Sequence, residues 1–205
     1  MSPLDLFRYS SLRIATITLS IGYLNVNFLY YGLSASSDKI GINSILNNFL
    51  LGMGSMIGVI VSFLIAGIVM RRYFGMFANF FSGICDMVIF FIIVPSSCEV
   101  CSENIAEVAL MTMVAIITLA QNQILYLHLV EAFPVAVRSM GIGIPTLFGT
   151  VGVFCSQFII ISAFEVSLKF PFLIMAAFGF IGTLSYYLAP ETLNEPLKEQ
   201  IDEIR

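Results

Sequence analysis

Long runs of apolar residues, separated by short polar or charged segments, fill most of the chain between Ile14 and Leu188. A helix needs about 20 residues to cross the hydrocarbon core of a membrane, and it satisfies its backbone hydrogen bonds internally where lipid cannot. Six runs are long enough, and they lie at residues 14–33, 45–70, 74–94, 106–129, 140–163 and 170–188. The second run is longer than a span requires, so we expect it to tilt or to leave the bilayer at one end. The pattern predicts an all-α membrane protein with six transmembrane helices.

The composition agrees with this prediction. Hydrophobic residues make up 59% of the chain and charged residues only 11%, with a mean hydropathy of +0.97. An ordinary soluble domain carries roughly 25% charged residues. The net charge of -4 argues against a nucleic-acid partner. The apolar runs make membrane lipid the expected surrounding.

The basic residues predict the orientation, because cytoplasmic loops retain an excess of Lys and Arg. A cytoplasmic N-terminus leaves only Lys39 and Lys169 on the outer side. The basic residues on the cytoplasmic side are then Arg8, Arg13, Arg71, Arg72, Arg138, Lys198 and Arg205. Six spans return the C-terminus to the cytoplasm, so residues 1–13 form a cytoplasmic segment and residues 189–205 a cytoplasmic acidic tail. We expect this tail to be a solvated end, and we expect no cleavable signal peptide, since the first run is too long for one.

The cysteines leave two interpretations open. Cys98 and Cys101 form a CxxC in the loop predicted to lie outside, where a local disulfide and two free thiols are equally plausible. Cys85 and Cys155 fall within spans, where a thiol acts as a small apolar side chain. Further metal ligands are not found near the CxxC, so neither a metal nor any other cofactor is expected.

Small residues predict close helix contacts. Gly54 and Gly58 form a GxxxG in the second span, a spacing that lets two helix backbones approach. Pro145 lies within the fifth span, where it could form a hinge or only a tolerated kink.

Polar side chains inside the spans are the best candidates for function, because burying them in a membrane is costly. Asp86 is the only charge deep in a span, and it should face the bundle or a cavity. It could contact a proton or a solute, or it could be held by a hydrogen bond from a neighbouring helix.

Two spans carry amide and phenol groups that a wet cavity could use to recognise a small solute. In the first span Asn27 shares a helix face with Tyr30 and Tyr31, and in the fourth Gln123 shares a face with Tyr126. Interhelical hydrogen bonds without a ligand are the competing interpretation. His128 lies near the end of its span, where we expect an interfacial role. Hydrolase motifs such as GxSxG and HExxH do not occur, so we do not expect an enzyme.

Several segments, in order along the chain, resemble signatures of one transporter family. The segment 131–141, with Glu131, Pro134, Arg138 and Gly141, resembles the E-[LA]-[FY]-P-T-x-x-R-x-x-G signature of the organic cation, anion and carnitine transporters. These form solute carrier family 22 of the major facilitator superfamily. Matching segments of the same family are Leu4-Asp5-Leu6-Phe7-Arg8, Tyr30-Tyr31-Gly32-Leu33-Ser34, Pro190-Glu191-Thr192 and Glu195-Pro196-Leu197.

The resemblance implies that the six spans correspond to helices seven to twelve of a twelve-helix carrier. Two six-helix halves would then enclose a central cavity and expose it to each side of the membrane in turn. Glu131 and Arg138 would make charge-paired contacts at the cytoplasmic ends of helices, and together with Arg71 and Arg72 they are the candidate gating residues.

The sequence departs from the family at two positions that bear on substrate charge. Gln123 stands where cation carriers have an acid, eight residues before Glu131, and Thr150 stands where the family tends to have a charge. Neither cation nor anion preference can therefore be carried over, although Asp86 could supply a replacement charge. The candidate residues of the substrate cavity are Asn27, Tyr30, Tyr31, Gln123, Thr150 and Asp86.

The expected function is transport of a small organic solute, such as an organic ion, a carnitine-like molecule or a zwitterion, by alternating access. The length allows three interpretations: a fragment of a full carrier, a half-size carrier that pairs with a second half, or a transport-inactive protein that regulates a partner transporter. The expected location is the plasma membrane.

Overall fold

The computed structural model describes residues 9–39, 44–93, 102–135 and 137–193. Within these ranges the chain is helical and contains no strand, which confirms the predicted all-α fold class. Six helices are long and apolar enough to cross a membrane. They are α2 (Ser10–Ser37), α3 (Ser44–Ile65), α4 (Arg71–Ile92), α5 (Ser102–Ala132), α6 (Arg138–Val166) and α7 (Phe170–Leu188).

The helix ends differ from the apolar runs in both directions. α2, α5 and α6 continue past their apolar runs into polar residues at both ends, because helical hydrogen bonding does not stop where hydropathy falls. α3 instead ends at Ile65, five residues before the apolar run does. The amides of Ile68 and Val69 both donate to the Ile65 carbonyl in a turn that contains Gly67, a weak helix former. The turn leads directly into α4.

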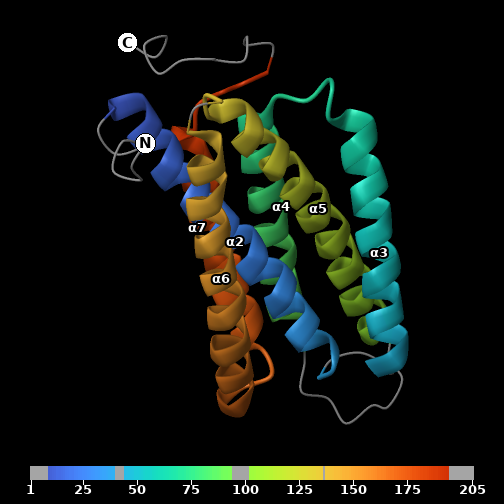
Figure 1. Ribbon diagram of the computed structural model, residues 1–205. Coiled ribbons are helices and arrows are strands. Elements are labelled where there is room, and N and C mark those ends of the chain that lie inside the picture. The colour runs from blue at the N-terminus through green and yellow to red at the C-terminus, as the bar shows by residue number, and fades with distance from the viewer. Residues whose placement is uncertain (1–8, 40–43, 94–101, 136, 194–205) are drawn as a thin grey trace.

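Close backbone contacts at glycine join α3 to α5 and α2 to α6, and the helices themselves are labelled in Figure 1. A Cβ added at Gly58 of α3 would clash with the Ile116 carbonyl of α5, and one at Gly152 of α6 would clash with the Leu24 carbonyl of α2. Neither position can therefore carry a side chain without moving a helix. The predicted role of the GxxxG in helix packing agrees with this geometry.

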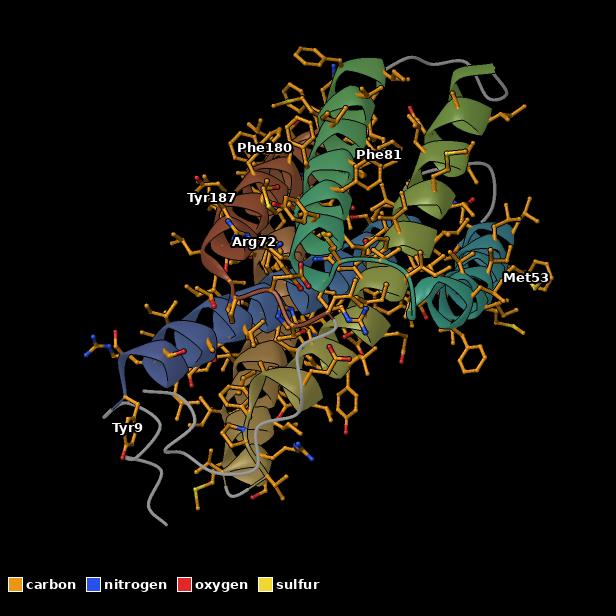
Figure 2. The ribbon with its side chains drawn as sticks, turned by 90° about the horizontal axis from the view of Figure 1, so that it is seen from above. Tyr9, Met53, Arg72, Phe81, Phe180 and Tyr187 are labelled. Carbon is orange, nitrogen blue, oxygen red and sulfur yellow. The ribbon has the colours of Figure 1, made fainter. Side chains whose placement is uncertain are left out.

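α4 and α7 form the third pair, and they lie on the opposite side of α2 and α5 from α6 and α3 (Figures 1 and 2). The backbones of Gly83 on α4 and Gly179 on α7 are so close that a Cβ at Gly179 would lie 2.8 Å from the Gly83 Cα. α6 runs unbroken through Pro145, which is buried, so no hinge is seen at this proline.

The interior contains two apolar clusters. One surrounds Phe28 of α2, whose ring stacks on Phe178 of α7 with centroids 3.9 Å apart. The other includes Leu12 of α2, Leu129 of α5 and Tyr186 of α7, near the end of the bundle where α2 begins and α7 ends.

The outer surface of α4 and α7, called here the α4–α7 face, is apolar. The exposed residues of this face include Phe77, Phe80, Ile84, Val88, Phe91, Ile181 and Leu184. Met53 on α3 likewise points away from the bundle (Figure 2). Such surfaces suit contact with lipid chains.

Candidate functional site

The opposite surface, formed by α2, α5 and α6 and called here the α2–α5–α6 face, carries polar groups within the spans. Tyr31 of α2 is 38% exposed, and its ring meets that of Tyr30 edge to face at 5.3 Å between centroids. The Tyr30 hydroxyl lies 3.3 Å from the Ser55 hydroxyl of α3. The two tyrosines therefore form an aromatic corner, with one ring open to the outside and the other held against α3.

α6 borders this corner. The side-chain amide of Gln157 donates to the Tyr31 carbonyl at 3.3 Å, which joins α6 to α2. Asn27 lies beside Gly149, where an added Cβ would be 2.9 Å from the Asn27 amide nitrogen. Thr150 is exposed next to this glycine, and its hydroxyl is bonded to the Thr146 carbonyl of its own helix at 3.0 Å. The structure thus groups the first-span and fifth-span candidates along one seam.

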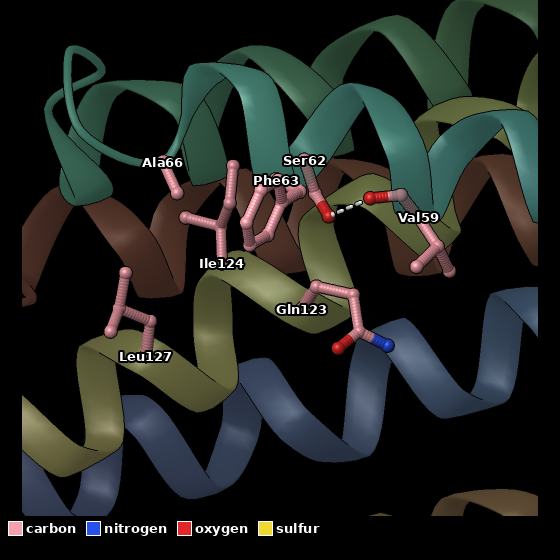
Figure 3. Close-up of a pocket in the computed structure, with 7 residues that line it drawn as sticks. All are labelled: Val59, Ser62, Phe63, Ala66, Gln123, Ile124 and Leu127. Carbon is pink, nitrogen blue, oxygen red and sulfur yellow. Dashed lines mark hydrogen bonds between the residues drawn. The ribbon is translucent and has the colours of Figure 1, made fainter.

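Gln123 lies in a separate hollow of about 200 Å³ between α3 and α5. Figure 3 shows it with Ser62 and Phe63 of α3 and Leu127 of α5 around it. The hollow opens to the outside of the bundle, and the exposed Tyr126 lies three residues further along α5. Gln123 is therefore on the α2–α5–α6 face but not in the seam beside Tyr31.

Two other amides of the same helices point inward. Asn25 of α2 is 1% exposed and donates to the Asn79 side chain of α4 at 2.6 Å, and Gln121 of α5 is also 1% exposed. Successive helical residues are about 100° apart, so two residues apart means nearly opposite sides of the helix. Asn25 and Gln121 consequently face the core, whereas Asn27 and Gln123 do not.

Asp86 is not brought together with the other cavity candidates. It is 0% exposed on the inner surface of α4, and neither of its carboxyl oxygens has a hydrogen-bond partner in the described chain. Its surroundings are the interior of the bundle.

A polar cluster, the Arg71–Glu131 cluster, joins α4, α5 and the segment after α7. Arg71 donates from Nε to Glu131 Oε2 at 3.1 Å and from Nη2 to Oε1 at 2.9 Å. The Thr192 hydroxyl donates to the same carboxylate at 2.8 Å. The Arg71 side chain is 6% exposed and that of Glu131 is 22% exposed, so water screens this bidentate pair only in part.

Glu191 completes the cluster by capping the start of α4. Its carboxylate accepts the backbone N–H groups of Arg71, Arg72, Thr192 and Leu193 at 3.0 to 3.1 Å. Partial burial raises the pKa of Glu191, but these donors outweigh it, and the pKa is lowered from its ordinary value. The first N–H groups of a helix lack intrahelical partners and carry partial positive charge, which explains the attraction.

The other candidate gating residues have different partners. The Arg72 guanidinium lies over the Tyr187 ring of α7 at 5.2 Å from the centroid, and the two residues are neighbours in Figure 2. Arg138 donates from Nε to the Phe133 carbonyl at 3.3 Å. The charge-paired contact expected at this end of the bundle therefore forms between Glu131 and Arg71, and Arg138 binds backbone.

Sequence reasoning missed several members of both sites. Glu191 was expected in a solvated tail, but it is held by four amides. His128 was expected at the interface, yet it is fully buried, with Nε2 2.8 Å from the Pro190 carbonyl. Ser55 and Gln157 could have been noticed as single polar residues in apolar runs. Cys98 and Cys101 lie outside the described residues, and no His, Cys, Asp or Glu group in the described part could hold a metal ion.

Comparison with known proteins decides the family. The sugar (and other) transporter family matches residues 8–204, almost the entire chain. The chain belongs to this transporter family. Its fold, six helices able to cross a membrane, is that of a multi-pass membrane protein in a lipid environment.

Similar members of the family include three mammalian solute carriers. The chain is 27% identical to mouse solute carrier family 22 member 21 over 202 residues, which is 98% of this chain and 34% of that protein. It is 26% identical to mouse organic cation/carnitine transporter 2, over 98% of this chain and 34% of that protein. It is 26% identical to rat organic anion transporter 3, over 98% of this chain and 36% of that protein.

These relatives confirm the resemblance to solute carrier family 22 that the sequence segments indicated. The chain spans about a third of the length of the curated relatives it matches. Relatives named for cations, anions and carnitine are equally similar, so similarity alone does not select a substrate charge.

Proposed function

We propose that this chain is one six-helix half of a twelve-helix carrier that moves a small organic solute across the plasma membrane by alternating access. The observation that carries the proposal is a difference between the two faces. The α2–α5–α6 face exposes amide, hydroxyl and phenol groups within its spans, among apolar residues such as Phe154 and Phe158, whereas the α4–α7 face exposes phenols only near its end. The polar face would pack loosely against a second six-helix half and enclose a wet cavity.

The chemistry of the polar face suits an organic ion, a carnitine-like molecule or a zwitterion. Tyr30 and Tyr31 present an aromatic corner that can stack on an ammonium group or cover an apolar ring. Asn27 and Gln123 offer amide donors and acceptors, and Thr150 adds a small neutral surface beside Asn27. A site of this kind recognises solutes by shape and hydrogen bonds, because it offers no fixed charge.

The Arg71–Glu131 cluster would hold one of the two transport states. It fastens the ends of α4 and α5 to the segment after α7 through one bidentate ion pair and two further side chains. In the orientation that the basic residues favour, both termini and this cluster lie in the cytoplasm. Opening the cytoplasmic side would require these contacts to separate, as in other interface switches.

Uptake by the protein reconstituted in lipid vesicles tests the solute site. Carnitine and a tetraalkylammonium ion are the probes, both radiolabelled. The double variant Tyr31→Ala with Gln123→Ala should lose most uptake, whereas Phe77→Ala with Leu184→Ala on the α4–α7 face should keep it. Unchanged uptake in the first variant would remove these residues from the site.

The role of the Arg71–Glu131 cluster in holding one transport state is tested separately, by reversing the charges of the pair. Arg71→Glu should change the transport rate more than the initial binding of solute, because the contact holds a conformation and does not touch the cavity. The exchanged pair Arg71→Glu with Glu131→Arg should recover part of the rate. Normal transport by Arg71→Glu alone would show that the pair does not hold a transport state.

A further inference from the structure

Asp86 is a buried carboxyl that the proposed cavity does not use. It is 0% exposed, and in the described chain no hydrogen bond or ion pair reaches either oxygen. Its neighbours on the helix, Cys85 and Ile89, belong to the apolar cluster around Phe28. A carboxylate in such surroundings lacks every form of compensation that would keep it charged.

Asp86 stands at the end of a buried stripe on α4. Arg71, Gly75, Asn79, Ser82 and Asp86 follow one another at spacings of four, four, three and four residues, so they lie on one face of the helix. All five are buried. At 1.5 Å per residue the stripe rises about 22 Å from the Arg71–Glu131 cluster.

Polar groups without partners accompany this stripe. Ser82, one turn from Asp86, has a buried hydroxyl with no hydrogen-bond partner in the described chain. His128 Nδ1 likewise lacks a hydrogen-bond partner in the described chain, whereas the Tyr186 hydroxyl and the Gln121 side chain are buried and interact with each other.

Tyr186 connects these groups to the stripe. Its ring packs against Gly75, where an added Cβ would clash with it, and also against Gly22 of α2. Asn79 donates to the Gly75 carbonyl at 2.8 Å and accepts from Asn25. Buried polar atoms that lack protein partners are the atoms that ordered water satisfies. The unpaired atoms of Ser82, His128 and Asp86 are therefore candidate positions for ordered water.

We propose that Asp86 is a proton-binding site that exchanges its proton with the Arg71–Glu131 end of the bundle along this stripe. One carboxylate oxygen takes a proton from a hydronium ion and becomes a neutral carboxylic acid, and release returns the proton to water. The proton is a fitting ligand because a metal cation would need several oxygen ligands, and the described residues form no such group. The link to transport rests on the proposed function: in such a carrier, the loading and release of this proton drive solute transport.

Several titratable groups surround the site and its path. The Cys85 thiol is the near neighbour with which Asp86 interacts electrostatically. The buried or partly buried titratable or charged groups of the packed helices include Tyr23 of α2, Arg71 and Arg72 of α4, Glu107, His128 and Glu131 of α5, and Tyr186 of α7. The control variants must leave these groups in place.

Infrared spectroscopy of the protein in lipid vesicles tests the site without any solute. The chain has aspartate only at Asp5, Asp38, Asp86 and Asp202. A variant with Asn at Asp5, Asp38 and Asp202, labelled with ¹³C-aspartate, reports Asp86 alone. We expect the carbonyl band of a protonated carboxylic acid, shifted by the label, which disappears reversibly as pH is raised.

The matched variants are made one at a time in the otherwise unsubstituted, labelled chain. Asp86→Asn should abolish the band and Asp38→Asn should not, because Asp38 is exposed and bonded to Ser44 and Asn48. Ser82→Ala should shift the pH at which the band disappears. Since the labelled protein retains Asp86, a folding defect in Asp86→Asn does not weaken the test. A labelled Asp86 seen only as carboxylate, or a band that no pH change removes, would overturn the proposal.

Carnitine uptake then separates this inference from the proposed function. With an inward proton gradient, wild-type vesicles should take up carnitine faster than without one, and Asp86→Asn should lose that acceleration. Uptake that is equally fast with and without the gradient would refute the coupling while leaving the carrier function intact. A titrating Asp86 in a protein that moves neither carnitine nor a tetraalkylammonium ion would keep the proton site and overturn the carrier function.

Discussion

The α4–α7 face and the α2–α5–α6 face are built from equally apolar spans, yet they present different chemistry. Phe80 and Leu184 represent the first face, whose exposed hydroxyl groups in the described spans are the Tyr73 and Tyr187 phenols near its end. Tyr31, Gln123 and Thr150 represent the second, where such groups are exposed at several depths.

The difference shows that the direction of a polar side chain matters more than the apolar fraction of its helix. α4 carries Asn79, Ser82 and Asp86, but all three are turned into the bundle, so its outer surface stays apolar. A membrane imposes this rule on any surface that touches lipid, because unpaired polar groups are costly there. A surface that exposes several polar groups within the spans is therefore the one we propose to face a cavity in place of lipid.

The largest effect should come from a charge at matched depth on the two faces. Phe80 and Thr150 both lie near the middle of their helices. Phe80→Arg should cost roughly 2.5–3.5 kcal/mol or more at insertion, because the guanidinium would enter lipid. Thr150→Arg should insert well if its face lines the proposed wet cavity. The yield of monodisperse protein extracted from membranes measures this, and equal losses in the two variants would mean that both faces touch lipid.

A smaller effect should follow from separating the helices that form the polar face. Gly152→Leu would push α6 away from the Leu24 backbone and cost roughly 1–3 kcal/mol through overpacking. Gly143 lies on the same helix with open space at its Cβ, so Gly143→Leu should have little effect. Thermal unfolding in detergent compares the two variants. Similar melting temperatures would contradict the close contact between α2 and α6.

Replacing the inward-facing Asn25 of α2 should cost more stability than replacing the outward-facing Asn27. The difference should be smaller than that between the two glycine variants. Asn25→Ala leaves the Asn79 side chain without its partner, at a cost of about 0.5–2 kcal/mol. Asn27→Ala removes only a 2.8 Å bond to the Tyr23 carbonyl of its own helix and should change stability by less than about 0.5 kcal/mol. Uptake should respond in the opposite order, with the greater loss in Asn27→Ala. Equal effects on both measurements would refute the assignment of the two sides.

The smallest effect concerns Glu191, at the end of the bundle that both faces share. Its pKa is lower in the folded protein than in the unfolded chain, so its stabilising contribution is complete above the unfolded pKa. That contribution is lost as pH falls through the folded pKa. Glu191→Gln should therefore weaken the acid-side fall in melting temperature, whereas Glu165→Gln, at an exposed carboxyl, should not. An unchanged pH profile in Glu191→Gln would contradict the capping role.

The fold could be predicted because it depends on properties that are local in the chain. Runs of about 20 apolar residues predict spans whatever their partners are. The helix period also separates Asn25 from Asn27, although it cannot say which of them faces inward. That choice depends on Asn79, 54 residues away, which the pattern of α2 does not contain.

The Arg71–Glu131 cluster shows even more clearly that a local pattern does not reveal contacts between distant positions. Arg71 and Glu131 were both candidates, but their pairing joins positions 60 residues apart, and Glu191 reaches the Arg71 amide across 120 residues. Charge counting treated Glu191 as one of several acids in a solvated tail. The depth of Asp86 was expected from its position in a span, whereas its lack of any partner became visible only from the packing.

The most direct test of the two faces is the labelling of single cysteines by a water-soluble, membrane-impermeant maleimide. The background would carry Ser or Ala at Cys85, Cys98, Cys101 and Cys155. We expect Thr150→Cys and Gln123→Cys to be labelled, with protection by a transported solute, and Phe80→Cys and Leu184→Cys to stay unlabelled in the intact membrane. Equal labelling on both faces, or labelling of the α4–α7 face alone, would contradict the account.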